Sequence, residues 1–345
     1  MVYLYSILRD FNLANIILHI SFPRAMSIVP VTALPRELLP QVFLTNKVPT
    51  TTLQSDPRVS YAAYIPDAHY APNNTLLPLL VSIHGTSREH SRHIAAWKSF
   101  AETHKCAILA PLFPAMLQGP LDVDGYHYLG QLPPKHAKMM RKPLQAQVAV
   151  KPMDGAEFST APTVRHDLLL LAMLDEMALR WPGIDTSKVY LSGFSGGGQF
   201  VHRFMYLHPE RVHAAAVGAP GLATLLNMDA AWPDGVEDLE AIFGKAALLE
   251  KLKQVPMLAA VGQLDGESRG AELRSAAGDN RAEGLTRKEA LLALAESWRV
   301  TGLQVEQVVV PGVGHHMEDI HPVLEEFMTR HITAWWEARA TRLET

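Results

Sequence analysis

A run of glycines around one serine is the most specific chemical signal in the sequence. Residues 189–198 read VYLSGFSGGG and contain the pattern G-x-S-x-G, made of Gly193, Phe194, Ser195, Gly196 and Gly197. An apolar run precedes it and a helical pattern over 199–208 follows, which is the strand–turn–helix setting that a nucleophilic serine of this kind requires. Side chains at Gly193 and Gly197 would collide with neighbouring backbone in so sharp a turn. We therefore predict that Ser195 is a catalytic nucleophile, the alternative being an incidental serine in a glycine-rich turn.

A serine hydroxyl needs a base to take its proton, and histidine is the usual one. Residues 308–316 read VVVPGVGHH, so a strand-like run ends in a glycine turn that carries two histidines. This turn should lie at the carboxyl edge of the sheet, where the serine turn also lies. We prefer His315, which directly follows the glycine, and keep His316 as the alternative.

The imidazole in turn needs an orienting carboxylate. In enzymes with this serine turn the order along the chain is serine, acid, histidine. Residues 257–262 predict a strand, and Asp265 follows it in a loop at the same edge of the sheet. Asp265 is therefore our choice, and the alternatives are Glu267, Asp279 and Asp229. An aspartate after a strand is also a common turn residue.

Attack on a carbonyl creates a negative oxygen, which needs N–H donors. The N–H of Gly196 is one, because this residue begins the helix after the serine. Residues 80–86 read LVSIHGT and supply an earlier strand and loop. In that loop, which begins with His84, Gly85 lets the backbone approach a substrate, and Thr86 would donate the second N–H.

Together these features resemble the α/β-hydrolase superfamily over roughly residues 60–340. The serine turn, the His-Gly loop, the Asp265 loop and the Gly-His turn occur in the family's order. The string FVHRFMYLHPERVHAAAVGAPG over 200–221 is similar to the esterase and depolymerase-like branch. The resemblance implies a Ser-His-Asp hydrolase that needs neither a metal nor an organic cofactor. It implies no particular substrate, because the family also holds lyases, transferases, ligand receptors and accessory hydrolases of fungal natural-product pathways.

The elements that must position these residues alternate along the chain. Apolar runs predict strands over 61–65, 79–83, 107–112, 188–192, 214–218, 257–262 and 305–310, and helical patterns predict helices over 91–104, 164–181, 196–208, 287–301 and 320–342. Near-continuous apolar strands are typical of sheets that helices cover on both faces. We therefore expect an α/β fold with a mostly parallel central sheet.

Two segments, 114–163 and 219–253, interrupt this alternation. We interpret them as cap or lid insertions in one catalytic domain over 41–345, with a solvated surface loop as the alternative for the basic stretch 135–142. The first half of the earlier segment predicts an apolar pocket wall, made of Phe113, Met116, Leu117, Tyr126, Tyr128 and Leu129. Residues 1–40 would be an N-terminal extension. Its apolar part, 11–22, is too short to span a bilayer and lacks the features of a signal peptide.

Composition narrows the class of protein. The 345 residues are 48% hydrophobic and 19% charged, which excludes a disordered chain. A net charge of -4 provides no basic field for nucleic acid. Cys106 is the only cysteine, so no intramolecular disulfide can form, which fits a reducing, cytoplasmic compartment. The sequence holds no H-E-x-x-H, and the pair His90 and His93 lacks a clear carboxylate partner, so we expect no metal.

These observations predict a serine hydrolase that cleaves a carboxylic ester, thioester or lactone of a medium-sized apolar substrate. One alternative is an enzyme of secondary metabolism that uses the same site for condensation, cyclisation or acyl transfer. Another is a non-catalytic binding protein on the same scaffold. The expected partner is a small-molecule substrate, without nucleic acid and without stable membrane insertion. A homo-oligomer is left open.

Overall fold

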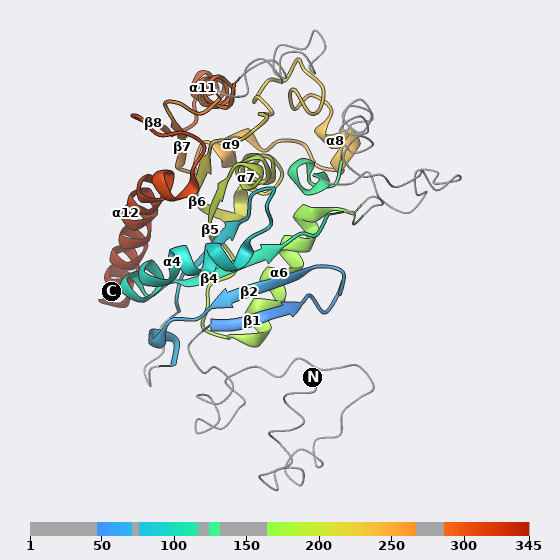
Figure 1. Cartoon of the computed structure of the whole chain (residues 1–345). Coiled ribbons are helices and arrows are strands. Elements are labelled where there is room, and N and C mark those ends of the chain that lie inside the picture. The colour runs from blue at the N-terminus through green and yellow to red at the C-terminus, as the bar shows by residue number, and fades with distance from the viewer. Residues whose placement is uncertain are drawn as a thin grey trace, which may run out of the picture.

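A sheet of eight strands forms the centre of the part of the chain that the computed structural model describes, residues 47–70, 76–115, 117, 124–131, 164–266 and 286–344 (Figure 1). The strands are β1 (Lys47–Thr52), β2 (Ser60–Tyr64), β3 (Leu79–Ile83), β4 (Ala107–Leu112), β5 (Val189–Phe194), β6 (Val212–Gly218), β7 (Met257–Gly262) and β8 (Val305–Val310). Their order across the sheet is β1-β2-β4-β3-β5-β6-β7-β8. Only β2 pairs in the antiparallel sense, with β1 and with β4, and every other pairing is parallel. The expected mostly parallel sheet is confirmed.

Helices connect the strands. The α-helices are α4 (His90–His104), α6 (His166–Arg180), α7 (Gly196–Leu207), α8 (Leu239–Phe243), α9 (Leu249–Leu252), α11 (Arg287–Val300) and α12 (Met317–Glu344). Short 3-10 helices are η3 (Asp67–Tyr70), η4 (Gly125–Tyr128) and η5 (Pro209–Arg211). The five longer helices occupy the positions that the sequence predicts. Within the described residues, no helix is both long enough and apolar enough to cross a membrane.

The helices cover both faces of the sheet, as side-chain alternation along the strands shows. In β2, the Tyr64 hydroxyl donates to Glu102 of α4, at 2.7 Å. The Tyr61 hydroxyl, three positions earlier and on the other face, donates to Glu176 of α6, also at 2.7 Å. Helix α12 packs beside α4, and α11 reaches α7 through a Trp298–Tyr206 hydrogen bond of 2.8 Å. The two layers are therefore α4 with α12, and α6 with α7 and α11.

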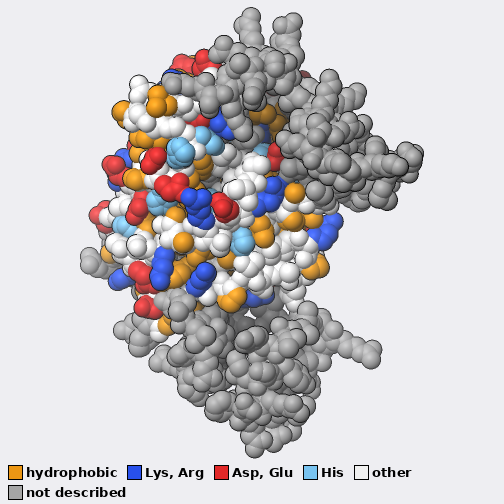
Figure 2. All heavy atoms as spheres, viewed as in Figure 1, with side chains coloured by type: hydrophobic (Ala, Val, Ile, Leu, Met, Phe, Trp, Pro, Cys, Tyr) orange, Lys and Arg blue, Asp and Glu red, His pale blue; other side chains and the backbone are white. Residues whose placement is uncertain are grey.

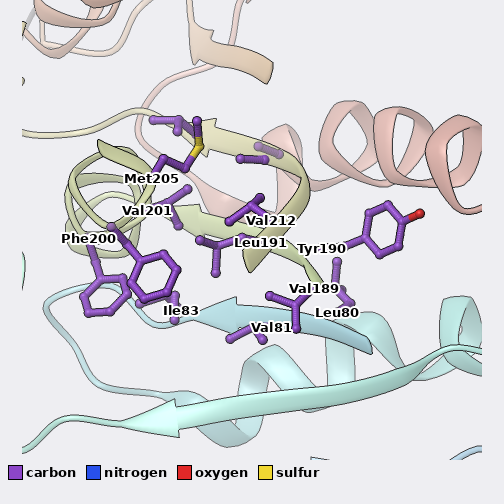
Figure 3. Packing of buried hydrophobic residues seen from close by; sticks show 14 of the residues in the cluster. Leu80, Val81, Ile83, Val189, Tyr190, Leu191, Phe200, Val201, Met205 and Val212 are labelled. Atoms are coloured by element: carbon purple, nitrogen blue, oxygen red, sulfur yellow. The ribbon is translucent and has the colours of Figure 1, made fainter. Parts of the chain in front are cut away.

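Helix α7 packs on the middle of the sheet, and its side chains form the core there. Phe200, Val201 and Met205 of this helix face residues of β3, β5 and β6 (Figure 3). All of these side chains are buried, including those of Ile83 and Leu191. Burial of one such side chain contributes about 1.5–3 kcal/mol to the free energy of folding. The helix that follows Ser195 is therefore anchored along its whole length.

The sequence missed β1 and the short helices α8 and α9. In β1 only Val48 is buried, so its sequence KVPTTT shows no apolar run. Residues 219–253 are described throughout and contain α8 and α9. The expected N-terminal extension 1–40 and most of the segment 114–163 lie outside the described residues. Of the expected pocket wall, Phe113, Tyr126, Tyr128 and Leu129 are buried and Leu117 is half-buried, whereas Met116 lies outside the described residues.

Acidic and basic side chains are interspersed on the face of the described part that Figure 2 shows. Several ion pairs in the described part join surface groups, such as Arg330 with Glu306 at 2.6 Å. No single sign of charge dominates the visible described surface. Such a mixed surface is what a net charge near neutrality favours.

Candidate active site

The serine turn lies at the carboxyl end of β5, where the strand passes directly into α7. Ser195 has φ 57° and ψ -117°, a backbone conformation that few non-glycine residues adopt. Its N–H donates to the carbonyl of Gly218 on the neighbouring strand β6, at 2.8 Å. A hydrogen bond to the neighbouring strand therefore holds the backbone of the strained turn. The Ser195 side chain is half-buried.

The glycines on either side of Ser195 leave room for backbone. A Cβ on Gly193 would lie 2.4 Å from the Gly197 carbonyl, and a Cβ on Gly197 would lie 2.1 Å from the Ile83 carbonyl oxygen. Both distances are far below any real Cβ contact. The start of α7 therefore packs on the end of β5 and on the loop after β3 at the same time.

A hydrogen-bonded chain links Ser195 to Asp265 through His315. The Nε2 atom of His315 lies 3.0 Å from Ser195 Oγ, and its Nδ1 atom lies 2.6 Å from Asp265 Oδ2. The imidazole also stacks on the Phe194 ring, with 4.6 Å between ring centroids. The ring is therefore held at both nitrogens and on one face.

The loops that carry the acid and the histidine are fastened to each other. The Leu264 N–H donates to the Val313 carbonyl at 2.8 Å, and the Gly312 N–H donates to the Gln263 side chain at 3.0 Å. The Asp265 carboxylate is fully buried, and its Oδ1 atom accepts from Arg287 Nη1 at 3.2 Å. Arg287 is the first residue of α11, and the sequence analysis did not single it out.

The structure describes two of the alternatives, Asp229 and His316. Asp229 is exposed, and its backbone N–H bonds to Asn227 in the segment between β6 and α8. His316 is exposed, whereas its neighbour His315 contacts Ser195. Glu267 and Asp279 lie outside the described residues.

The loop after β3 passes beside Ser195. A Cβ on Gly85 would lie 3.6 Å from Ser195 Cβ, so this loop and the serine turn are in contact. His84 fixes the loop: its Nδ1 atom donates to the Gly85 carbonyl at 2.8 Å, and its Nε2 atom accepts from the Phe113 N–H at 3.0 Å. Burial lowers the pKa of His84 to about 3, so the imidazole is neutral, as this pair of bonds requires.

Helix η4 adds His127, which the sequence analysis did not single out, beside Tyr126, which it assigned to the pocket wall. A Cβ on Gly196 would lie 2.2 Å from His127 Nε2 and 2.5 Å from the Tyr126 hydroxyl oxygen. The Tyr126 hydroxyl donates to the His84 carbonyl at 3.1 Å. Residues 124–131 therefore cover the start of α7 beside Ser195. No spacing in the sequence indicates this contact, because η4 and α7 are about 70 positions apart.

Nucleophilic chemistry is what this arrangement can perform. An imidazole within hydrogen-bonding distance of a serine hydroxyl can take its proton, and a buried carboxylate behind the ring stabilises the resulting cation. The first turn of α7 points free N–H groups toward the same place. Among the described residues, no group of three His, Cys, Asp or Glu side chains is arranged to hold a metal ion.

Comparison with solved structures identifies the fold. A poly(3-hydroxybutyrate) depolymerase from Bordetella parapertussis matches with a TM-score of 0.55 at 23% identity, over 78% of this chain and 85% of that one. A poly(aspartic acid) hydrolase-1 from Sphingomonas sp. KT-1 matches with a TM-score of 0.53 at 18% identity, over 78% and 92%. An S-formylglutathione hydrolase from Agrobacterium tumefaciens matches with a TM-score of 0.51 at 13% identity, over 82% and 91%.

No protein-family model matches the chain, and no curated protein matches it by sequence. The structural matches cover most of both partners in each pair. The mostly parallel sheet and the place of the serine turn between β5 and α7 agree with what the resemblance in the sequence implies. The chain therefore has the α/β-hydrolase fold.

Proposed function

We propose that this protein is a serine hydrolase that cleaves a carboxylic ester, or a related thioester or lactone, through an acyl-enzyme. The observation that carries the proposal is the continuous chain of hydrogen bonds from Ser195 Oγ through His315 to Asp265. The names of the three similar structures, a depolymerase and two hydrolases, favour the same class of reaction.

In the proposed reaction, Ser195 Oγ attacks the carbonyl carbon while its proton passes to His315 Nε2. Asp265 holds the ring through Nδ1 and stabilises the imidazolium. The carbonyl oxygen takes up the electron pair and is stabilised by the N–H groups of Gly196 and Thr86. The imidazolium then protonates the departing alkoxide or thiolate. A water molecule, activated by the same imidazole, hydrolyses the acyl-serine and restores the enzyme.

The proposal extends to a medium-sized apolar acyl group. Aromatic side chains pack against the residues of the site: Phe194 stacks on His315, and Tyr126, whose hydroxyl donates to the His84 carbonyl, stacks with Phe113 at 5.8 Å between centroids. Ligand sites are mostly apolar with few polar groups. A series of p-nitrophenyl esters from acetate to decanoate should therefore show a maximum of kcat/KM at intermediate chain length.

Labelling with a fluorophosphonate probe tests the proposed nucleophile. The wild-type protein should be labelled and should hydrolyse p-nitrophenyl esters. Ser195→Ala should lose both, with kcat lower by up to about a million-fold where the three residues act as a unit. Its thermal midpoint should stay close to that of the wild type. Labelling or turnover of Ser195→Ala at the wild-type rate contradicts the proposal.

A further inference from the structure

His127 lies over the N-terminus of α7, against Gly196, the residue that follows Ser195. Its Nε2 atom occupies the space that a side chain on Gly196 would need, since a Cβ there would lie 2.2 Å away. The same atom lies 3.4 Å from Thr86 Oγ1. His127 Nε2 therefore lies close to both Gly196 and Thr86, the two residues proposed to donate backbone N–H groups to the oxyanion.

The surroundings of His127 determine which nitrogen carries its proton. Arg203 Nη1 donates to Gln199 Oε1 at 3.2 Å, and this bond turns the amide nitrogen of Gln199 toward His127. Gln199 Nε2 then lies 3.5 Å from His127 Nδ1 and can only donate. His127 Nδ1 is therefore the acceptor. In a neutral imidazole the other nitrogen, Nε2, must hold the hydrogen.

The ring is neutral because of its position. Burial, followed by the positive charges of Arg203 and Arg88, lowers the pKa of His127 well below its usual value. The Asp124 carboxylate, at 3.8 Å from Nε2, is the acidic group facing this edge of the ring. Among the described residues, the Nε2–H group makes a long hydrogen bond to Thr86 Oγ1, at 3.4 Å, and Asp124 Oδ1 lies beyond hydrogen-bonding distance at 3.8 Å.

We propose that the Nε2–H group of His127 is a third donor to the oxyanion, beside the N–H groups of Gly196 and Thr86. This inference rests on the proposed function, because it concerns the same attack on a carbonyl by Ser195. The negative oxygen formed in that attack accepts a hydrogen bond from Nε2, and His127 keeps its proton throughout. The proton of Ser195 still passes to His315.

Arg203 and Gln199 act as positioning residues in this arrangement. The Arg203 guanidinium is fully buried and also donates to the His127 carbonyl at 2.7 Å and to Thr224 Oγ1 at 2.8 Å. It lies over the Tyr128 ring, at 4.4 Å from the centroid. The arginine therefore fixes the backbone of η4 and the tautomer of its histidine. A donor fixed before the reaction needs no reorganisation when charge develops.

The test compares His127→Leu with His127→Gln, which keeps an N–H group near the position of Nε2. His127→Leu should lower kcat for p-nitrophenyl butyrate by about 10²–10³-fold with little change in KM, as for loss of one oxyanion donor. An aryl trifluoromethyl ketone forms a tetrahedral adduct with an anionic oxygen, so its inhibition constant should rise by a similar factor. His127→Gln should recover most of both losses.

Leu207→Ala is the control for packing. Leu207 is the last residue of α7, is fully buried and lies at the opposite end of the helix from Ser195, and its side chain has no hydrogen to donate. Its loss should lower the thermal midpoint while kcat and ketone binding stay within about threefold of the wild type. The inference is overturned if His127→Leu keeps wild-type kcat and ketone affinity, or if Leu207→Ala loses as much. A wild-type protein that fluorophosphonate does not label contradicts the proposed function instead.

Discussion

Asp265 accepts hydrogen bonds from two cationic or potentially cationic groups, His315 at 2.6 Å and Arg287 at 3.2 Å. Asp265→Asn keeps the shape of the side chain but replaces an acceptor by an amide that can donate. His315 then adopts the wrong tautomer for taking the Ser195 proton. We expect kcat to fall by about 10⁴-fold, as in the precedent for such a change. Steady-state hydrolysis of p-nitrophenyl butyrate measures this.

Three carboxylates serve as controls for that measurement. Asp229→Asn changes an exposed side chain and should leave kcat within about twofold. Glu267→Gln and Asp279→Asn should also cost little, because the Asp265 carboxylate already bonds to His315. A large loss in Asp279→Asn with little loss in Asp265→Asn would show that the acid had been wrongly assigned.

Gly197 and Gly85 allow a second comparison at the level of single residues. A Cβ on Gly197 would meet the Ile83 carbonyl at 2.1 Å, whereas a Cβ on Gly85 would meet its nearest atom at 3.5 Å, an ordinary contact. Gly197→Ala should therefore lower the free energy of unfolding by at least about 1–3 kcal/mol. Gly85→Ala should change it by less than about 1 kcal/mol. Urea denaturation of both variants checks this, and equal losses would contradict the packing described at the serine turn.

The sequence predicts the residues of the site that follow a recognisable strand, and it does not predict those whose contacts depend on how distant segments pack together. Ser195, Asp265 and His315 each follow an apolar strand, so a local pattern predicts that they meet at one edge of the sheet. The contact of His127 with Gly196 depends on how residues 124–131 fold back onto α7, which no local pattern encodes. The pairing of Arg287 with Asp265 likewise depends on where α11 begins.

At the scale of elements, α11 holds the acid loop through its first turn. Thr286 caps this helix: its hydroxyl accepts from the Glu289 N–H at 3.2 Å, and the Glu289 carboxylate accepts from the Thr286 N–H at 2.8 Å. Thr286→Ala should lower the free energy of unfolding by about 1 kcal/mol. It should also lower kcat by a few-fold, because the Arg287 next to it contacts Asp265.

Thr301→Ala is the control at the other end of the same helix. The Thr301 hydroxyl donates to the Ser297 carbonyl at 2.7 Å, far along the chain from the acid loop. Its loss should affect stability alone. Denaturation curves and kcat for the two variants separate the effects. A drop in kcat that is the same in both would mean that α11 does not position the acid.

The sequence predicts an element where burial of that element produces a continuous run of apolar residues. Strands β3, β4, β5 and β7 are buried at nearly every position and appear as continuous apolar runs. Strand β1 packs only Val48 inward, so its polar sequence gives no such signal. Helix η4 is too short for any helical period, although all four of its residues are buried.

At the scale of the whole molecule, the interior is rich in histidine. His84, His93, His127, His166 and His202 are all buried. Burial lowers the pKa of His84 to about 3 and the pKa of His93 and His166 to about 4, and it lowers the other two well below their usual value. In the unfolded chain each has a pKa of about 6.5.

These shifts make stability fall as the solution becomes acidic. Above pH 6.5 the histidines are neutral in both states, so folding binds and releases no protons. Below that value the unfolded chain binds protons that the folded protein excludes, until the folded pKa values near 4 and 3 are reached. Each buried histidine then lowers the free energy of unfolding by about 1.4 kcal/mol per pH unit. The urea midpoint should therefore be constant from pH 8 to 7 and fall steeply between pH 6.5 and 5.

A variant that lacks one buried histidine should take up one proton fewer when it unfolds below pH 6.5. His93→Gln keeps a polar group beside Ser82, whose hydroxyl lies 2.8 Å from His93 Nδ1. Its urea midpoint should be lower than that of the wild type at pH 7.5. Below pH 6.5 its free energy of unfolding should decline less steeply than that of the wild type, by about 1.4 kcal/mol per pH unit. His316→Gln changes an exposed side chain and should leave the slope as it is. A wild-type midpoint that stays constant down to pH 5 would mean that the interior histidines titrate in the folded protein as they do in the unfolded chain.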